Sequence, residues 1–476
     1  MNDLHVSFRE KCGYGLGDAA SNIFWKLFSM YLLFFYTDIF GLPAAAVGTM
    51  FLVTRIWDAL IDPVVGVMAD RTQTRWGKFR PYLLWFLVPF GVLGVLTFTT
   101  PDFGPTGKLV YAYVTYSLMM MVYSLVNVPY ASLLGVISPD TKVRTTLSSF
   151  RMVFAFGGGI LSLVLIEPLV RAFGSLREVA TAEGSVPDQQ LGWSAGVAVL
   201  ALVAMLFLLC TFLWTRERVR PVGEQKNALR DDIRDLFRNS PWWILLGSGI
   251  FVLIFNSIRD GAAVYYFKYF VDAPSQLDLG WIGGSVTLVT LYLVLGQIAN
   301  IAGILLMAPV ANRIGKKRTY LGAMLLAGVL SVAFYFLGSD DIVPILVLQV
   351  LISVCAGSVM PLLWSMYADT ADYSEVRTGR RATGLIFSSS SMSQKFGWTL
   401  GGALTGWLLA WFGFEANQVQ AEGALTGIRM MLSILPAAGA LLSVLFLLFY
   451  PLNERRVEEI GRKLEAARAD AARSGN

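Results

Sequence analysis

The chain has 476 residues, of which 55% are hydrophobic and only 15% are charged, and its mean hydropathy is +0.59. Soluble domains carry about 25% charged residues, so this composition excludes a soluble protein and predicts an all-α membrane protein. The single histidine argues against a histidine-based catalytic site, and the three scattered cysteines lack the spacing of a metal site or a disulfide framework. We therefore expect no enzyme activity, no catalytic residues and no resident cofactor.

Apolar runs long enough to cross a bilayer as helices, which takes about 20 residues, recur along the whole chain. They predict twelve transmembrane helices. The N-terminus lacks a short apolar core with a small-residue cleavage site after it, so no cleavable signal is expected. The twelve spans are expected, in chain order, at about residues 20–41, 45–68, 81–100, 109–137, 150–173, 193–214, 241–271, 281–311, 319–338, 342–368, 384–413 and 426–450.

The basic residues lie mostly on one side of these spans. Of the 38 Lys and Arg residues, 28 fall in the termini and in the loops on the same side, whereas the opposite loops carry three. Because positively charged loops stay in the cytoplasm, we expect both termini to be cytoplasmic, in a bacterial cytoplasmic (inner) membrane. Topology then accounts for the net charge of +5. We expect the lipid bilayer as surroundings, no nucleic-acid partner, and a functional monomer.

Short motifs recur six spans apart. The segment "GVMADRTQTRWGKFRPY" (66–82) after the second span matches "APVANRIGKKRTY" (308–320) after the eighth, and a second pair of similar segments accompanies the fourth and tenth spans. Such duplication is typical of major facilitator transporters, whose substrate lies near the midplane between two six-helix halves. The predicted divisions are an N-terminal half at 1–214, a cytoplasmic loop at 215–240, a C-terminal half at 241–450 and a cytoplasmic tail at 451–476.

Charged residues inside the spans are the candidates for function. Each costs at least about 2.5–3.5 kcal/mol at the bilayer centre, so each should face protein or a water-filled cavity. Asp58 and Asp62 are four residues apart and share one helical face. Two desolvated, mutually repelling carboxylates gain affinity for a cation, which could be a proton or, with oxygen from Ser124 or Asn127, sodium. The alternative is a purely structural ion pair of Arg55 with Asp58.

Polar and aromatic residues of other spans are candidate sugar contacts. Asp18 and Asn22 present donors and acceptors at a spacing that suits sugar hydroxyls. Trp25 offers a flat face for a pyranose ring, although an aromatic residue at helical spacing more often serves packing. Arg151 and Lys395 are long donors that could reach hydroxyls or balance the buried acids.

These residues belong to a larger set of motifs. In their identity and order, the motifs resemble the glycoside–pentoside–hexuronide:cation symporters, the group of melibiose permease within the major facilitator superfamily. The resemblance covers nearly all of the chain. Its carriers are "GYGLGDAASN" (13–22), "FFYTDIFGL" (34–42), "VGTMFLVTRIWDALIDPVVGVMADRTQTRWGKFRPYLL" (47–84), "YSLVNVPYASL" (123–133), "WSMYADTADYSEVRTGRRATG" (364–384) and "SQKFGWTLGGAL" (393–404).

The resemblance implies a cation site and a sugar site. The family's cation site corresponds to Asp58, Asp62 and Ser124. Its sugar site corresponds to Asp18, Asn22, Asn127, Arg151 and Lys395, to which Trp25 is added from the reasoning above.

Two departures from the family pattern refine the expectation. Melibiose-type members have an aspartate where this chain has Asn127, so a galactoside preference is not expected. The sodium-using pattern has a polar side chain between the two acids, and Ile61 in its place favours a proton. The forms "GDAASN" and "NVPY" look more like the xyloside, glucoside and hexuronide branches.

The expected function is therefore secondary active symport, in which a sugar or glycoside of these types enters with H+ or Na+ by alternating access. A membrane-embedded enzyme is a different class, for which the chain offers no catalytic group. A sugar sensor, or an exporter of the same fold without cation-coupled uptake, stays open. Adjacent charges at Arg259 and Asp260 are a further candidate pair, for a place near the external mouth.

Overall fold

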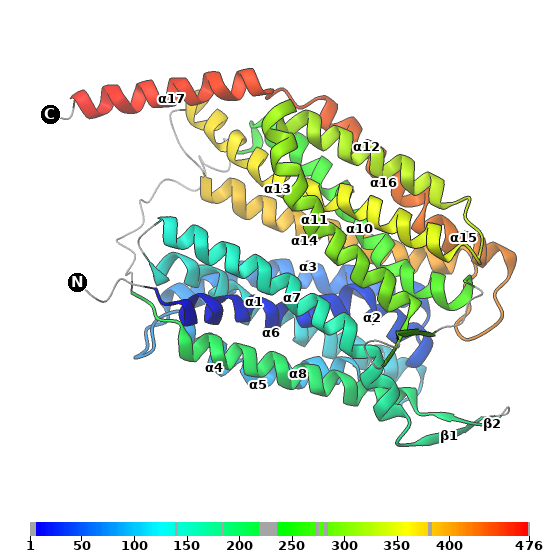
Figure 1. Cartoon of the computed structure of the whole chain (residues 1–476). Helices are drawn as coiled ribbons and strands as arrows, with labels where there is room; N and C mark the ends of the chain where they lie inside the picture. The colour runs from blue at the N-terminus through cyan, green and yellow to red at the C-terminus, as the bar shows by residue number, and fades with distance from the viewer. Residues whose placement is uncertain are drawn as a thin grey trace.

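The chain folds into a bundle of long helices with two short β-hairpins, as the computed structural model shows (Figure 1). The structure describes residues 6–138, 141–181, 184–218, 236–271, 276–279, 284–378 and 383–474. Most of the predicted inter-half loop lies outside these residues.

The N-terminal half contains the first six predicted spans. Its elements are α1 (Phe8–Met30), α2 (Leu32–Phe34), the π-helix η2 (Phe35–Ile39), α3 (Ala44–Arg71), α4 (Arg80–Trp85), α5 (Leu87–Thr97), α6 (Pro105–Ile137), α7 (Thr141–Gly174), the antiparallel strands β1 (Glu178–Thr181) and β2 (Gly184–Pro187), and α8 (Gln189–Trp214).

The C-terminal half contains the other six spans and a helical tail. Its elements are α10 (Ser240–Tyr269), the antiparallel strands β3 (Gln276–Leu279) and β4 (Gly284–Thr287), α11 (Leu288–Ile314), α12 (Lys316–Phe334), α13 (Ile342–Thr378), α14 (Thr383–Trp411), α15 (Glu422–Leu432), α16 (Ile434–Leu448) and α17 (Glu454–Ser474).

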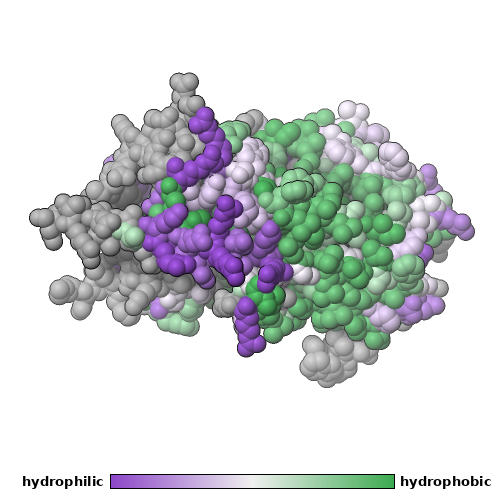
Figure 2. All heavy atoms as spheres, turned by 90° about the horizontal axis from the view of Figure 1, so that it is seen from above, coloured by the Kyte–Doolittle hydropathy of each residue, from purple (hydrophilic) through white to green (hydrophobic). Residues whose placement is uncertain are grey.

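A helical segment is present at every one of the twelve predicted positions. Within the described residues, eight segments are long and apolar enough to cross a membrane: α6, α7, α8, α10, α11, α12, α13 and the α15–α16 pair. The other four spans are α1 with α2 and η2, α3, α4 with α5, and α14. Figure 2 shows the matching surface, a broad apolar area with hydrophilic residues toward its two ends.

Four predicted boundaries were wrong by seven residues or more. Helix α7 begins at Thr141 rather than near residue 150, and α13 continues to Thr378 rather than ending near residue 368. The first helix begins at Phe8 rather than near residue 20, because Ser7 caps it by accepting a hydrogen bond from the Glu10 amide (3.2 Å). The small residues that follow, from Gly13 to Ser21, are mostly buried against the protein, so this part of the helix needs no apolar sequence. The eighth helix begins later than predicted, at Leu288, where the Thr287 hydroxyl caps it.

The twelfth span is broken at Ser433, and a buried arginine explains how the break is tolerated. Ser433 has φ −126° and ψ −89°, which ends α15 and starts α16. The freed carbonyl of Leu432 accepts a hydrogen bond from the Arg259 guanidinium, which also donates to Tyr292 (3.0 Å) and Gln349 (2.8 Å). Arg259 is thus a structural pin that is buried within the C-terminal half. Its place relative to an external mouth stays a prediction.

The two halves lie side by side, with both chain termini at one end of the bundle (Figure 1). Helices α3 and α14, α7 and α11, and α1 and α10 meet across the boundary between the halves. Glycines bring α3 and α14 into close contact, because a Cβ atom on Gly406 would lie 2.9 Å from the Cα atom of Gly48. Small residues of this kind let membrane helices pack backbone to backbone.

At the end of the bundle opposite the termini, a network that we call the far-end seal joins the halves. The Asp38 carboxylate of η2 accepts hydrogen bonds from Lys268 of α10 (2.6 Å) and from Tyr269. The Asp38 carbonyl accepts one from Asn417, which precedes α15 (2.6 Å). Thr37 and Tyr265 add a hydroxyl pair at 2.8 Å. The halves are therefore closed against each other at this end.

Candidate functional site

The first candidate cluster is built on α3, near the middle of the bundle. Asp58 is buried, with 2% of its surface exposed, and one carboxylate oxygen accepts a hydrogen bond from Ser124 of α6 (2.6 Å). The other oxygen lies 3.5 Å from the Arg55 guanidinium, one turn earlier on α3, and 3.5 Å from the Lys395 ammonium of α14. One acid thus meets a hydroxyl and two basic groups.

The second acid shares one of these basic groups. Asp62 forms an ion pair with Lys395, which therefore bridges the two carboxylates from the opposite half of the protein. The other Asp62 oxygen, Oδ1, is buried and has no hydrogen-bond partner among the described residues. A buried carboxylate oxygen normally has a partner, so this atom is available to a cation or a proton donor.

The second candidate cluster joins α1 and α7. Arg151 donates two hydrogen bonds to the Asp18 carboxylate, from Nε at 3.1 Å and from Nη2 at 3.4 Å. Helices α1 and α7 pack closely next to this ion pair and hold its two side chains together. A Cβ atom on Gly158, two turns after Arg151, would lie only 2.7 Å from the Cα atom of Ala19. The Arg151 side chain remains about one-third exposed, so a solute can reach it.

Two amides and an indole complete the candidate sugar contacts. The side-chain nitrogens of Asn22 and Asn127 each donate to a backbone carbonyl one turn earlier, at 2.9 and 3.1 Å. Their oxygens therefore remain able to accept hydrogen bonds from a sugar. Trp25 lies at the centre of the bundle, with the Arg55 guanidinium 4.9 Å from its ring centroid and the Tyr123 ring 6.1 Å away.

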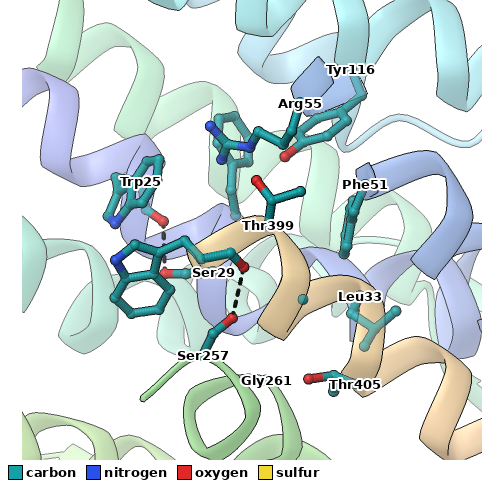
Figure 3. A pocket seen from close by; sticks show the side chains of 13 residues that line it. Trp25, Ser29, Leu33, Phe51, Arg55, Tyr116, Ser257, Gly261, Thr399 and Thr405 are labelled. Atoms are coloured by element: carbon teal, nitrogen blue, oxygen red, sulfur yellow. Dashed lines mark hydrogen bonds between the residues drawn. The ribbon is translucent and has the colours of Figure 1, made fainter. Parts of the chain in front are cut away.

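A small cavity adjoins these residues between the halves. Arg55 and Trp25 reach it from the N-terminal half, and Trp398 and Ser257 reach it from the C-terminal half (Figure 3). The rings of Trp25 and Trp398 meet edge to face, with centroids 6.0 Å apart. A lining of aromatic groups with a few polar ones is typical of small-molecule sites.

Comparison with known proteins identifies the family. Residues 13–454 match the model of the family described as MFS/sugar transport protein. The chain belongs to this family. The match confirms the predicted major facilitator fold of two six-helix halves and the resemblance to its cation-coupled sugar symporters.

Several relatives in this family match the chain over nearly its full length. The inner membrane symporter YicJ of Escherichia coli is 37% identical over 98% of this chain and 96% of its own. A protein named as a glycoside/cation symporter, YagG of E. coli, is 36% identical over 98% of this chain and 96% of its own length. The isoprimeverose transporter of Lactiplantibacillus pentosus is 37% identical over 94% of this chain and 90% of its own length.

A solved structure supports the fold alone. It is a bacterial homologue of the human lysosomal transporter Spinster, in an inward-facing and unoccupied conformation, with a TM-score of 0.66 at 13% identity. The match covers 95% of the present chain and 97% of the homologue's chain. The present chain is thus a multi-pass membrane transporter and not an enzyme, as the composition predicts.

Within this family fold, the predicted residues form two groups. The cation candidates Asp58, Asp62 and Ser124 come together on α3 and α6. Of the sugar candidates, Asp18 and Arg151 are in direct contact, whereas Lys395 lies with the acid pair. The predicted ion pair of Arg55 with Asp58 is present as well, so the acid pair has both a structural partner and a partner from the other half.

Sequence reasoning identified Lys395 in the C-terminal half and missed Trp398. Trp398 stands one turn after Lys395 in the same motif, "SQKFGWTLGGAL", and lines the cavity. Asp260 of α10 lies within the electrostatic field of Lys26 of α1, across the boundary between the halves. The position of a residue within one span does not reveal which residue of another span it faces.

Proposed function

We propose that this transporter is a secondary active symporter that imports a sugar or glycoside of the xyloside, glucoside or hexuronide type together with a cation. The observation that carries the proposal is the bridge from Lys395 of the C-terminal half to Asp58 and Asp62 of the N-terminal half. This bridge joins the two halves at a pair of acids. Relatives named as a glycoside/cation symporter and an isoprimeverose transporter support the substrate class.

The coupling step follows from competition for the two carboxylates. When no cation is bound, the Lys395 ammonium supplies the positive charge that the buried acids require. A cation that binds Asp58, Asp62 and Ser124 takes over this role and releases the lysine. The link between the halves then weakens, and the equilibrium between conformations shifts by the difference in affinity of the cation for each state.

The identity of the cation is part of the proposal. Sodium prefers several oxygen ligands, and the described acid cluster offers two carboxylates and the Ser124 hydroxyl, with apolar Ile61 between the acids. This small set of oxygens favours H+ over Na+ as the coupling cation. Proton transfer to a carboxylate needs no further ligand, and the unpartnered Asp62 oxygen is able to receive it.

We assign sugar binding to Asp18, Asn22, Asn127 and Arg151, with Trp25 as the stacking surface. The Asp18–Arg151 pair offers charged acceptors and donors on one partly exposed surface, which suits neighbouring hydroxyls of one ring. Lys395, one turn before Trp398 on α14, keeps its assigned sugar contact in the cation-loaded state, when it is free of the acids.

We further propose that the end with the chain termini is cytoplasmic and that the far-end seal is external. The positive charge of the loops at the terminal end supports this orientation in a bacterial inner membrane. The conformation described here is then closed on the external side. The two halves would rock against each other around the midplane, with the helices between residues 8–214 and 240–448 as the moving bodies.

The test is uptake by proteoliposomes containing the purified full-length chain. A panel of labelled methyl glycosides of xylose, glucose and glucuronic acid is offered, with inward proton and sodium gradients imposed separately. We expect accumulation of at least one glycoside, driven by the proton gradient. Asp58→Asn and Asp62→Asn should abolish accumulation and retain sugar exchange, whereas the exposed loop variant Asp102→Asn should behave as the wild type.

Other outcomes would contradict specific parts of the proposal. Normal accumulation by either acid variant would exclude the acid pair as the coupling site. Accumulation driven only by sodium would overturn the assignment of the proton. Binding without gradient-driven uptake would favour the sensor or exporter.

A further inference from the structure

Two charged residues on opposite sides of the boundary between the halves have no part in the proposed coupling step. Lys26 lies on α1 and Asp260 on α10, and these two helices are in contact. Both side chains are half-buried. The electrostatic field of each acts on the other. Because a charge within a membrane-spanning helix is costly unless it is compensated, the presence of both calls for an explanation.

The other charged groups nearby are already engaged. Asp18, two turns before Lys26 on α1, accepts hydrogen bonds from Arg151. Arg259 contributes less to the field at Asp260 than Lys26 does, and it donates its hydrogen bonds to acceptors of its own half. Within the described residues, neither the Lys26 ammonium nor the Asp260 carboxylate makes a hydrogen bond or an ion pair. Each is therefore the available counter-charge for the other.

The two charges lie between the sugar candidates and the far-end seal. At 1.5 Å per helical residue, Lys26 is about 12 Å from Asp18 in one direction and about 18 Å from Asp38 in the other. Asp260 is about 12 Å along α10 from Lys268, which binds Asp38 in the seal. A solute that enters from the far end therefore passes this level before it reaches Asp18.

The helices around the two charges border the small cavity between the halves. Trp25, next to Lys26, and Gly261, next to Asp260, both line this cavity (Figure 3). The base of the lysine side chain rests on α7, because a Cβ atom on Gly159 would lie 3.0 Å from the Lys26 Cγ atom. The two charges thus attract each other across the boundary without direct contact.

The strength of this attraction depends on how closely the halves approach each other. Lys268 of α10 binds Asp38 of η2, which follows α1 and α2, so opening of the far end separates the α1 side from α10. Attraction between two charges falls as their distance grows and as water enters between them. Opening therefore weakens the interaction of Lys26 with Asp260 as well as breaking the hydrogen bonds of the seal.

We propose that Lys26 and Asp260 form an electrostatic gate below the far-end seal, which holds α1 near α10 while the far end is closed. The transporter then closes this end in two layers, a hydrogen-bonded one at the seal and a charged one deeper in the bundle. The proposal requires two halves that move against each other. It does not depend on the sugar, the coupling cation or the orientation in the membrane.

Distances between spin labels test the gate on the full-length chain in lipid nanodiscs, without sugar and with the three native cysteines replaced. Labels at Leu176 and Phe336, exposed at the far end in different halves, report closed and open populations by double electron–electron resonance. Lys26→Met and Asp260→Asn should each lower the ratio of closed to open about threefold, as expected for the loss of one interaction. Lys463→Met removes an exposed charge from α17 and is the control, which should keep the wild-type ratio.

Exchange of the two charges separates electrostatic pairing from packing. Asp260→Lys alone places two ammonium groups near each other and should lower the ratio about tenfold. Lys26→Asp/Asp260→Lys restores opposite charges in reversed positions and should return the ratio to within about twofold of the wild type. If a charge-reversal variant does not fold, Lys26→Met/Asp260→Asn replaces it. This double variant should lower the ratio no further than either single variant, because all three lose the same interaction.

Three results would overturn the proposal. An unchanged ratio in both Lys26→Met and Asp260→Asn would exclude a gate at this level. An exchange variant that stays as open as Asp260→Lys, or single effects that add in the neutral double variant, would show that the two residues act separately. None of these measurements involves a sugar or a gradient, so their outcome is independent of the proposed symport.

Discussion

The far-end seal should control which side of the membrane the transporter opens to, and Asp38→Asn tests this directly. The Asp38 carboxylate is buried, and three groups donate hydrogen bonds to it: the Lys268 ammonium at 2.6 Å, the Thr37 hydroxyl at 2.6 Å and the Tyr269 hydroxyl. An asparagine keeps the size of the side chain. It loses the charge and one of the two acceptor oxygens.

The size of the effect follows from the nature of these bonds. A hydrogen bond to a charged group contributes about 1.5–3 kcal/mol. Because the Lys268 side chain is one-third exposed, solvent screens part of the interaction and we take the lower end, about 1.5–2 kcal/mol. The bonds from Lys268 and Tyr269 of α10 exist only when the halves meet at this end, so their loss falls on this conformation. The equilibrium should shift about 10- to 30-fold toward opening at the far end.

Distances between spin labels would measure this shift. Leu176, after α7, and Phe336, after α12, are exposed at the far end, at 75% and 76%, and belong to different halves. Double electron–electron resonance on labelled cysteines at these positions should show a longer-distance population that grows in Asp38→Asn. Labels at Phe8 and Phe237, exposed at the terminal end, should show the opposite change. Unchanged distributions at both ends would refute the assignment of the seal as a conformational lock.

Three further variants test other parts of the structure. Arg151→Lys cannot reproduce the two hydrogen bonds to Asp18, so the sugar affinity measured by calorimetry should fall about tenfold while uptake remains cation-dependent. An unchanged affinity would exclude the pair from the sugar site. Gly406→Leu places a side chain against the backbone of α3, so transport should be lost. The population with short distances between the far-end spin labels should decrease, whereas Gly322→Leu, the control, should behave as the wild type. Arg259→Met leaves several buried acceptors without a donor, which costs about 1–3 kcal/mol of stability for each. The melting temperature in a fluorescence assay should therefore fall by several degrees. An unchanged melting temperature would contradict the structural role of Arg259.

The sequence predicted the architecture well because the bilayer constrains it strongly. Every spanning segment must satisfy its backbone within a helix and expose apolar side chains to lipid, so hydropathy alone located the twelve spans. The positions that it misplaced have a different physical origin. The first turn of α1 is exposed and the residues from Gly13 to Ser21 are mostly small and packed against protein, so no hydropathy signal marks the start at Phe8.

The candidate site was predictable only within single helices. The spacing of Asp58 and Asp62 established a shared face, and the structure places both against Lys395. The contacts between helices depend on rotation and depth, which the local pattern does not encode. For this reason Trp398 and its place in the cavity wall emerged only from the packed structure.

Arg55 provides the physical link between the two proposed sites. Its guanidinium stacks on Trp25, whose ring borders both the sugar contacts and the cavity, and it lies 3.5 Å from the Asp58 carboxylate. In the proposed mechanism, a sugar that moved Trp25 would change the surroundings of the proposed cation site, and a cation that neutralised Asp58 would release Arg55 from its acid. Coupling between two binding events is reciprocal, and this contact gives both directions a shared residue. Symport then needs no long pathway through the protein, because Lys395 joins the halves and Arg55 joins the ligands within the same cluster.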